Sequence, residues 1–308
     1  MSNFEYNKVR ALLAYLAMEA GHPQTRTSLC ALLWPELPEN TARQNLSQAL
    51  SQLRRVLREK QAPAPYLLAN SDSVQLNPTA PVEADAARFL SLITKAEAHS
   101  HRDWHLCSAC AEDLQQAVSL YRGDFLAQFY VSDSADFEAW AQTLRERLRQ
   151  HMLSALERLV RYFEWRGAYE QAVEITRKYV ELDPWLDSSH RELMRLLALS
   201  GQRNAALAQY AHLKRTLDTE LGLEPEPETT GLFEKIRVEA SLDALRRFQL
   251  PVSILPMPPM PLIGRTADLD SVQRLFHDRT RLLTLTGAPG VGKTRLALEI
   301  ATRMRFDF

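Results

Sequence analysis

The chain has 308 residues, of which 45% are hydrophobic and 24% are charged, and its formal net charge is −1. This length allows two or three domains with buried cores, and the charge excludes a nucleic-acid affinity that rests on an overall basic excess. The three cysteines (Cys30, Cys107 and Cys110) do not form the even set of a disulfide framework, and no apolar run is long enough to span a bilayer. We therefore expect a cytoplasmic protein that has no signal peptide and no membrane partner.

Stretches rich in Leu, Ala, Arg and Glu with helical spacing fill most of the chain, so the predicted fold is mainly α. Prolines interrupt this pattern near 61–65 and again at 250–261, where they favour an extended linker. We predict four parts: a winged helix-turn-helix domain at 1–80, a TPR-like α-helical repeat domain at 81–245, a Pro-rich linker at 246–261, and a truncated α/β P-loop segment at 262–308.

The first part should contain three helices and a hairpin. The expected elements are helices at 7–20, 27–33 and 40–59 and a hairpin that joins 66–69 to 74–76. Thr25 is the candidate cap of the second helix, and Asn40 or Thr41 is the candidate cap of the third. The Asn/Asp/Ser content of residues 70–73 suits a hairpin turn.

The third helix is strongly amphipathic. Its apolar stripe consists of Ala42, Leu46, Ala49, Leu50, Leu53 and Leu57. Its polar side and flanks carry Arg43, Gln44, Ser47, Gln48, Ser51, Arg54, Arg55 and Arg58. Amides and hydroxyls can bind base edges in the major groove, while guanidiniums can bind phosphates or guanine.

An ordinary solvated helix would show the same charges, so the pattern alone leaves both interpretations open. The order of the elements favours DNA binding, because a short helix, a tight turn, a long basic helix and a hairpin are the winged-helix succession. The hairpin would then be the wing.

Three stretches of this part, 8–16, 26–35 and 42–57, resemble the winged helix of SARP-family transcriptional activators. The resemblance implies that the eight polar residues of the third helix lie on a recognition helix and that the loop 34–40 faces RNA polymerase. In one respect the chain departs from the family. The family usually places a small antiparallel sheet before the first helix, whereas here that helix is expected almost at once, near Asn7.

The middle part shows an internal repeat. Two pairs share an offset of 34 residues: Gly167 with Gly201, and Ala172 with Ala206. The tetratricopeptide pattern is matched by Tyr162, Gly167, Tyr169, Ala172 and Pro184. These positions are expected to form a packed core and a concave protein-binding surface. The stretches 120–126, 137–140, 190–203 and 220–225 resemble the bacterial transcriptional activator domain of the same family, which implies dimerisation and regulatory contacts.

A group of histidines and cysteines lies within this part: His99, His101, His105, Cys107 and Cys110. Two thiolates and two imidazoles could hold zinc tetrahedrally. An exposed loop between helices with incidental residues explains the same pattern, because only one Cys-x-x-Cys pair is present. The sequence leaves both interpretations open.

Near the end, a strand-like run at 281–286 leads into a P-loop and then into a helix expected at 295–304. Its nucleotide-binding residues would be Gly287, Gly290, Gly292, Lys293 and Thr294. Together with the upstream stretch 261–265, this loop resembles the start of a STAND-type NTPase module. Only 14 residues follow Thr294, so no second strand supplies the Walker B aspartate. We expect no hydrolysis, no catalytic residues and no required cofactor, with ATP and Mg²⁺ as ligands of a longer form only.

The sequence therefore predicts a transcriptional activator rather than an enzyme. It would bind repeats in double-stranded promoter DNA as a homodimer and recruit RNA polymerase. Two other hypotheses stay open: an ATP-driven STAND signalling switch of which this chain is the N-terminal portion, and a protein-binding repeat scaffold without DNA affinity.

Overall fold

The computed structural model describes residues 3–80, 82–99 and 107–238 and, further on, residues 265, 268–269, 271–272, 283–287 and 291–303. Its residues form two compact units. The first unit is built from 1–100 and 107–159, and the second begins at Val160. No helix in the described ranges is both long enough and apolar enough to cross a membrane.

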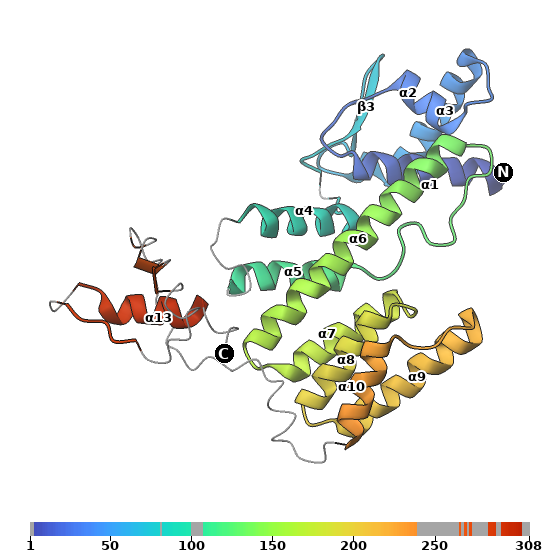
Figure 1. The fold of residues 1–308 in the computed structure, drawn as a ribbon. Helices are drawn as coiled ribbons and strands as arrows, with labels where there is room; N and C mark the ends of the chain where they lie inside the picture. Colours follow the sequence, from blue (N-terminus) through green and yellow to red (C-terminus); the bar gives the residue numbers. More distant parts are fainter. Residues whose placement is uncertain are drawn as a thin grey trace. The chain divides into compact units, whose positions relative to one another are not determined.

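The first unit begins with the three predicted helices, α1 (Asn3–Met18), α2 (Arg26–Leu33) and α3 (Glu39–Val56). Figure 1 shows them gathered at one end of this unit. Thr25 caps α2 as predicted, because its Oγ1 accepts a hydrogen bond of 3.1 Å from the Ser28 amide. The predicted cap of α3 was wrong. Pro38 holds that position, and its carbonyl accepts the first helical bond, from Ala42.

A small antiparallel sheet completes the winged helix. Its strands are β1 (Gln24–Thr25), β2 (Leu67–Ala69) and β3 (Ser73–Leu76), in the order β1-β3-β2. The predicted hairpin is confirmed, and its turn is held by the Asn70 side chain, whose oxygen accepts bonds from the Asp72 and Ser73 amides at 2.8 and 2.7 Å. The two-residue strand β1 was not predicted.

The core of the first unit extends beyond the winged helix. Leucines of all three helices meet in it, among them Leu12, Leu29 and Leu46, each fully buried. The same cluster includes Phe137 and Ala141, which come from α6 (Ala135–Trp165). Apolar packing therefore crosses the predicted boundary between residues 80 and 81.

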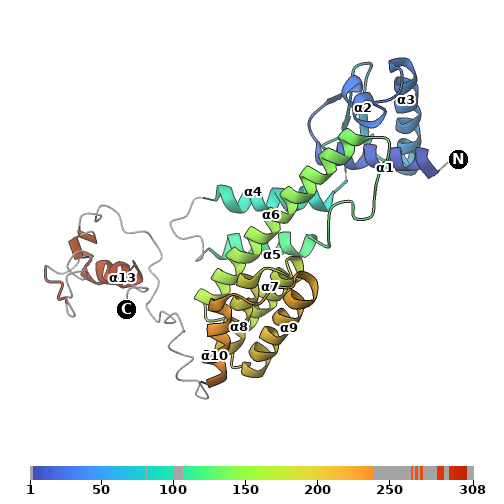
Figure 2. The ribbon, with the colours of Figure 1, turned by 45° about the vertical axis from the view of Figure 1, so that its right-hand side comes forward.

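Two further helices, α4 (Asp85–Ala98) and α5 (Ser108–Leu120), complete the first unit. They lie side by side as an antiparallel pair, as both ribbon views show (Figures 1 and 2). Phe89 and Ile93 of α4 and Leu114 and Val118 of α5 are buried. The pair is the part of the unit that holds His99, Cys107 and Cys110.

The second unit is a stack of helices: α7 (Tyr169–Leu182), α8 (Asp187–Leu199), α9 (Arg203–Leu221) and α10 (Pro227–Val238) (Figure 2). The repeat expected from the glycine spacing is visible in the helix ends. Gly167 and Gly201 both adopt positive φ, at 71° and 82°, just after a helix. In both turns the next amide bonds back to the helix, Ala168 to Phe163 and Gln202 to Leu197. The predicted α-helical repeat domain is confirmed.

One polar residue in this stack has a consequence for stability. His190 on α8 is fully buried, and its two ring nitrogens contact the Pro184 carbonyl at 2.9 Å and the Gln209 side-chain nitrogen at 2.8 Å. Burial lowers the pKa of this imidazole below its ordinary value of 6.5, because the charged form loses its hydration, and nearby His212 adds to the effect.

We expect acid to destabilise this unit through His190. The unfolded chain binds a proton here below about pH 6.5 while the folded chain does not, so the free energy of unfolding falls by up to about 1.4 kcal/mol per pH unit in that range. Thermal unfolding of the wild type and of His190→Gln, followed at about pH 7.5 and about pH 5.5, measures this. A smaller loss in the variant is expected. Equal losses would contradict the assignment.

At the C-terminal end, the structure describes the helix α13 (Lys293–Arg303) and a small cluster of Leu269, Val272 and Ile300. The helix confirms the prediction, with its start two residues earlier than expected. None of the described residues 283–287 is assigned to a strand, and Gly290 lies outside the described residues.

Candidate nucleic-acid interface

The apolar stripe of α3 faces the core of the winged helix. Five of its six predicted members are buried: Ala42, Leu46, Ala49, Leu50 and Leu53. Leu57, the sixth, is half-buried and packs against the same cluster. The stripe fixes the rotation of α3 about its own axis, so the residues opposite to it must point outward.

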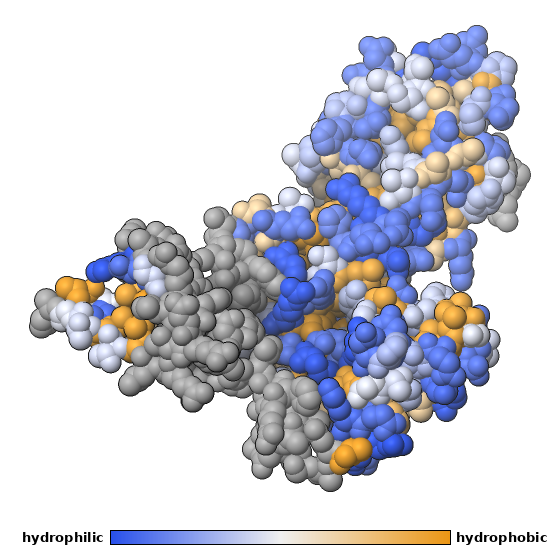
Figure 3. Space-filling model, viewed as in Figure 1, coloured by the Kyte–Doolittle hydropathy of each residue, from blue (hydrophilic) through white to orange (hydrophobic). Residues whose placement is uncertain are grey.

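The polar side of α3 is turned to solvent. All eight residues that the sequence predicted as DNA contacts are exposed: Arg43, Gln44, Ser47, Gln48, Ser51, Arg54, Arg55 and Arg58. In the space-filling view, hydrophilic side chains predominate over the winged-helix end of the first unit (Figure 3). The arrangement leaves the donors and acceptors of α3 available to a ligand.

Two of the arginines are engaged within the protein. The Arg43 guanidinium lies 2.9 Å from the Glu39 carboxylate, and that of Arg54 lies 3.1 Å from Glu59. The Arg43–Glu39 pair is exposed, and an exposed ion pair contributes little stability, so a phosphate can replace that carboxylate at small cost. Among the described residues, Arg55 and Arg58 have no ion-pair partner, which leaves both guanidiniums available for phosphate.

Arg58 does not lie on the recognition helix, contrary to the prediction. The helix ends at Val56 with Leu57 as its C-cap, and Arg58 adopts the left-handed conformation with φ 53°. A short 3-10 helix, η1 (Glu59–Gln61), follows. The reversal places Arg58 beside Ser51, Arg54 and Arg55 in the lining of a hollow of about 680 Å³.

Arg58→Gly is expected to stabilise the fold by about 1 kcal/mol, because a side chain in the left-handed region strains the backbone and glycine does not. Chemical denaturation of the variant and the wild type measures this change. Arg58→Ala serves as the control, since alanine keeps the strain and should leave stability unchanged. A Gly variant that is no more stable than the Ala variant would contradict the expectation.

The wing is tied to the helix that precedes α3. The Arg26 amide at the start of α2 donates to the Asp72 carbonyl at 2.9 Å, and the Arg26 side chain donates to the Asn70 carbonyl at the same distance. These bonds hold the hairpin turn against the helix. The wing is therefore held by Arg26 in addition to the pairing of β3 with β1.

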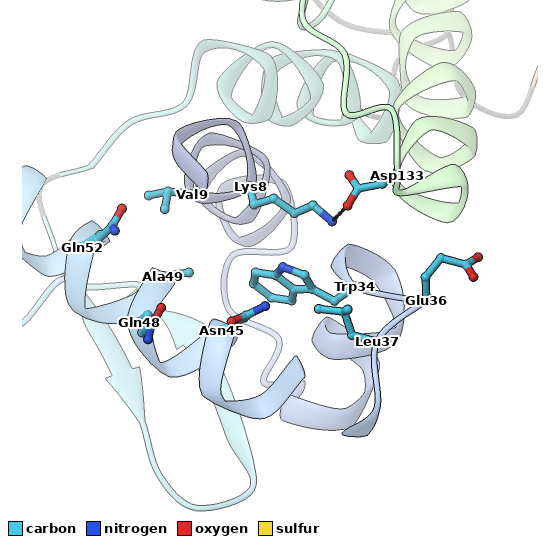
Figure 4. A pocket seen from close by; sticks show the side chains of 10 residues that line it. All are labelled: Lys8, Val9, Trp34, Glu36, Leu37, Asn45, Gln48, Ala49, Gln52 and Asp133. Carbon is cyan, nitrogen blue, oxygen red and sulfur yellow. Dashed lines mark ion pairs between the residues drawn. The ribbon is translucent and has the colours of Figure 1, made fainter. Parts of the chain in front are cut away.

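Sequence reasoning missed a buried lysine that orders this domain. Lys8 of α1 is only 2% exposed, lies 2.8 Å from the Asp133 carboxylate, and donates a hydrogen bond to the Leu33 carbonyl. Figure 4 shows it extended toward Asp133 with the Trp34 ring close by; the ammonium is 5.4 Å from the ring centre. Its position among apolar residues of the first helix was the available signal.

This lysine closes one side of a pocket of about 280 Å³. Glu36 and Leu37 of the loop predicted to face polymerase line it, together with Asn45 and Gln48 of α3 (Figure 4). In that loop Trp34 is buried while Leu37 is 39% exposed. The pocket therefore joins the loop to the polar side of α3.

The described residues of the predicted P-loop lie at and before the start of α13. Gly287 and Gly292 adopt positive φ, at 155° and 83°, a backbone conformation that favours glycine. The Lys293 ammonium donates to the Gly287 carbonyl at 2.8 Å, and Thr294 is exposed. Since Gly290 lies outside the described residues, the predicted nucleotide site stays a prediction.

Comparison with known proteins identifies the family to which the helices after the winged helix belong. The family model of the bacterial transcriptional activator domain matches residues 84–237, which span α4 to α10. This chain belongs to that family. One protein similar to this chain is AfsR of Streptomyces coelicolor, a regulatory protein that is 30% identical over 322 residues, which is 97% of this chain and 30% of AfsR.

A second similar protein is the transcriptional regulator RedD of Streptomyces coelicolor. It is 29% identical over 71% of this chain and 60% of RedD. The chain thus spans less than two thirds of either relative. The solved structure of Mycobacterium tuberculosis EmbR in complex with a low affinity phosphopeptide superposes with a TM-score of 0.50 at 22% identity, covering 87% of this chain and 65% of that chain. This likeness confirms the predicted fold class. The SARP resemblance is confirmed for the activator domain, and the STAND-type module stays a prediction.

Proposed function

We propose that this chain is the DNA-binding and activator part of a transcriptional regulator. The domains would be the winged helix at 1–80, the activator domain at 81–245 and the linker at 246–261. The observation that carries the proposal is the exposed polar side of α3, opposite an apolar stripe of which five of six members are buried. The relatives support it, since AfsR and RedD are named as regulators.

In this proposal α3 enters the major groove of duplex DNA. Gln44, Gln48 and the serines would bind base edges, because amides and hydroxyls offer donors and acceptors at the width of a groove-bound helix. Arg55 and Arg58 would bind phosphates near the end of α3. The hairpin, held by Arg26, would lie against a neighbouring groove or the backbone.

Two partners follow from the same architecture. The loop 34–40 would contact RNA polymerase, and its exposed Glu36 and Leu37 are suited to a protein surface. The helical repeat domain would join two copies, so that the two winged helices bind direct or inverted repeats. Half-site spacing then follows the geometry of the dimer.

Selection of double-stranded DNA from a random pool tests the proposal. Repeated rounds of binding to the 308-residue chain should enrich two copies of one short motif, and a run-off assay with RNA polymerase should give more transcript from a promoter that carries it. A pool that shows no enriched motif at low and moderate salt would contradict DNA reading.

A second candidate is an ATP-dependent signalling switch. The positive-φ glycines before α13 are the observation in its favour. Hydrolysis of ATP by this chain, measured beside DNA binding, would reverse the ranking. We expect none.

A further inference from the structure

We propose that His99, Cys107 and Cys110 bind a thiophilic metal ion, with zinc as the natural occupant, at one end of the α4–α5 pair. The ligand atoms of these three side chains lie within 4.8 Å of one another. The sequence alone had left two interpretations open, a zinc site and a loop with incidental residues. His101 and His105, also candidates on sequence, lie outside the described residues and carry no part of the argument.

The three residues converge because two helix ends meet there. His99 is the C-cap of α4, Cys107 is the N-cap of α5, and Cys110 lies in the first turn of α5. The Cys107 side chain makes no capping hydrogen bond to α5, so its sulfur is not committed to the helix. A Cys-x-x-Cys pair at a helix start turns both sulfurs toward one point, and α4 supplies an imidazole to the same point.

The distances fit tetrahedral coordination. With Zn–S near 2.3 Å and Zn–N near 2.0 Å, sulfur and nitrogen ligands of one zinc lie about 3.5 Å apart. Nδ1 of His99 lies 3.2 Å from the Cys110 sulfur and 3.4 Å from the Cys107 sulfur. An ion can therefore enter between the three atoms with only small side-chain movements.

Burial distinguishes the two sides of the cluster. Cys110 is 2% exposed and its sulfur also contacts the Ala96 carbonyl at 3.6 Å, whereas His99 is exposed. The exposed side leaves room for a fourth ligand, such as water.

A redox disulfide between Cys107 and Cys110 is the competing use of this motif. A disulfide has no use for His99, whose Nδ1 lies against both sulfurs at 3.2 and 3.4 Å. The geometry therefore favours a metal, which displaces the thiol protons on binding.

The first test is the zinc content of the 308-residue chain purified under reducing conditions without chelators. We expect about one zinc per chain, as for a single site with three protein ligands. Cys107→Ser, Cys110→Ser and His99→Ala should each lose most of it. Cys30→Ala and His22→Ala are the matched controls, since they remove the same residue types from the winged helix, and both should retain the metal.

The second test needs no variant and so does not depend on any variant folding. Cobalt added to the metal-free wild type should give a sulfur-to-cobalt charge-transfer band and tetrahedral d–d bands, and zinc should abolish both. A chelator should lower the thermal midpoint of the wild type. Absence of bound zinc together with absence of cobalt bands would overturn the proposal, and so would a Cys107–Cys110 disulfide in a chain that binds no metal. Neither result bears on DNA binding.

Discussion

Replacement of Arg55 and Arg58 together by alanine is expected to weaken DNA binding about 30-fold and to lower the slope of log affinity against log salt by about 2. Both guanidiniums lie at the end of α3 without an ion-pair partner among the described residues, so each can bind a phosphate. A charge-assisted hydrogen bond contributes about 1 kcal/mol or more, and each neutralised phosphate adds about 0.9 to the slope.

The substitution should not disturb the fold. Both side chains are exposed, and alanine at position 58 keeps the same backbone strain. The control is Arg147→Ala/Arg177→Ala, which removes the same charge from exposed positions on α6 and α7. Titration by fluorescence anisotropy at several salt concentrations measures both quantities. Equal affinity and slope in the two double variants would remove the end of α3 from the interface.

Asp133→Ala is expected to destabilise the first unit by about 3 kcal/mol. The carboxylate is the ion-pair partner of Lys8, whose ammonium is almost fully buried between α1 and the Trp34 ring. Removal of the acid takes the carboxylate away from a buried positive charge. The partial exposure of Asp133 places the effect at the lower end of the range for buried pairs.

A second substitution separates the charge from the packing. Lys8→Met combined with Asp133→Ala should recover at least half of the loss, because a buried pair can be replaced by apolar groups at small cost. Glu146→Ala, which breaks an exposed pair with Arg149 on α6, is the control and should cost at most about 0.5 kcal/mol. Urea denaturation measures all three. No recovery in the double variant would show that the packing of Lys8, and not its charge, is the cause.

Periodicity of apolar residues was sufficient to predict most helices. The stripe of α3 and the glycine spacing of the repeat both correspond to local geometry, since burial of one helix face and the left-handed turn after a helix need only nearby residues. The cap of α3 was wrong because Pro38 ends the preceding loop with its carbonyl already aligned, and a side-chain cap is then not needed. The strand β1 was not predicted, because two residues are too few to show the alternation of apolar and polar residues that indicates a strand.

The sequence predicted which residues of the candidate site are exposed, but it did not predict the contacts that hold the site in place. Sequence identifies which side of α3 is polar, because that depends only on spacing along one helix. It could not show that Lys8 meets Asp133, which is more than a hundred residues away, or that Phe137 packs into the winged-helix core. It also could not show that His99 lies against the two cysteine sulfurs, since that depends on where the end of α4 meets α5.

Photocrosslinking from α3 to DNA tests the central claim most directly. A photoreactive amino acid at Gln48, on the exposed side of α3, should crosslink to bases of the selected duplex, and the same amino acid at exposed Gln116 on α5 should not. Mapping of the crosslinked bases to the major groove is the result that we predict. DNA binding that persists while Gln48 gives no crosslink, or crosslinks no more than Gln116, would contradict the account.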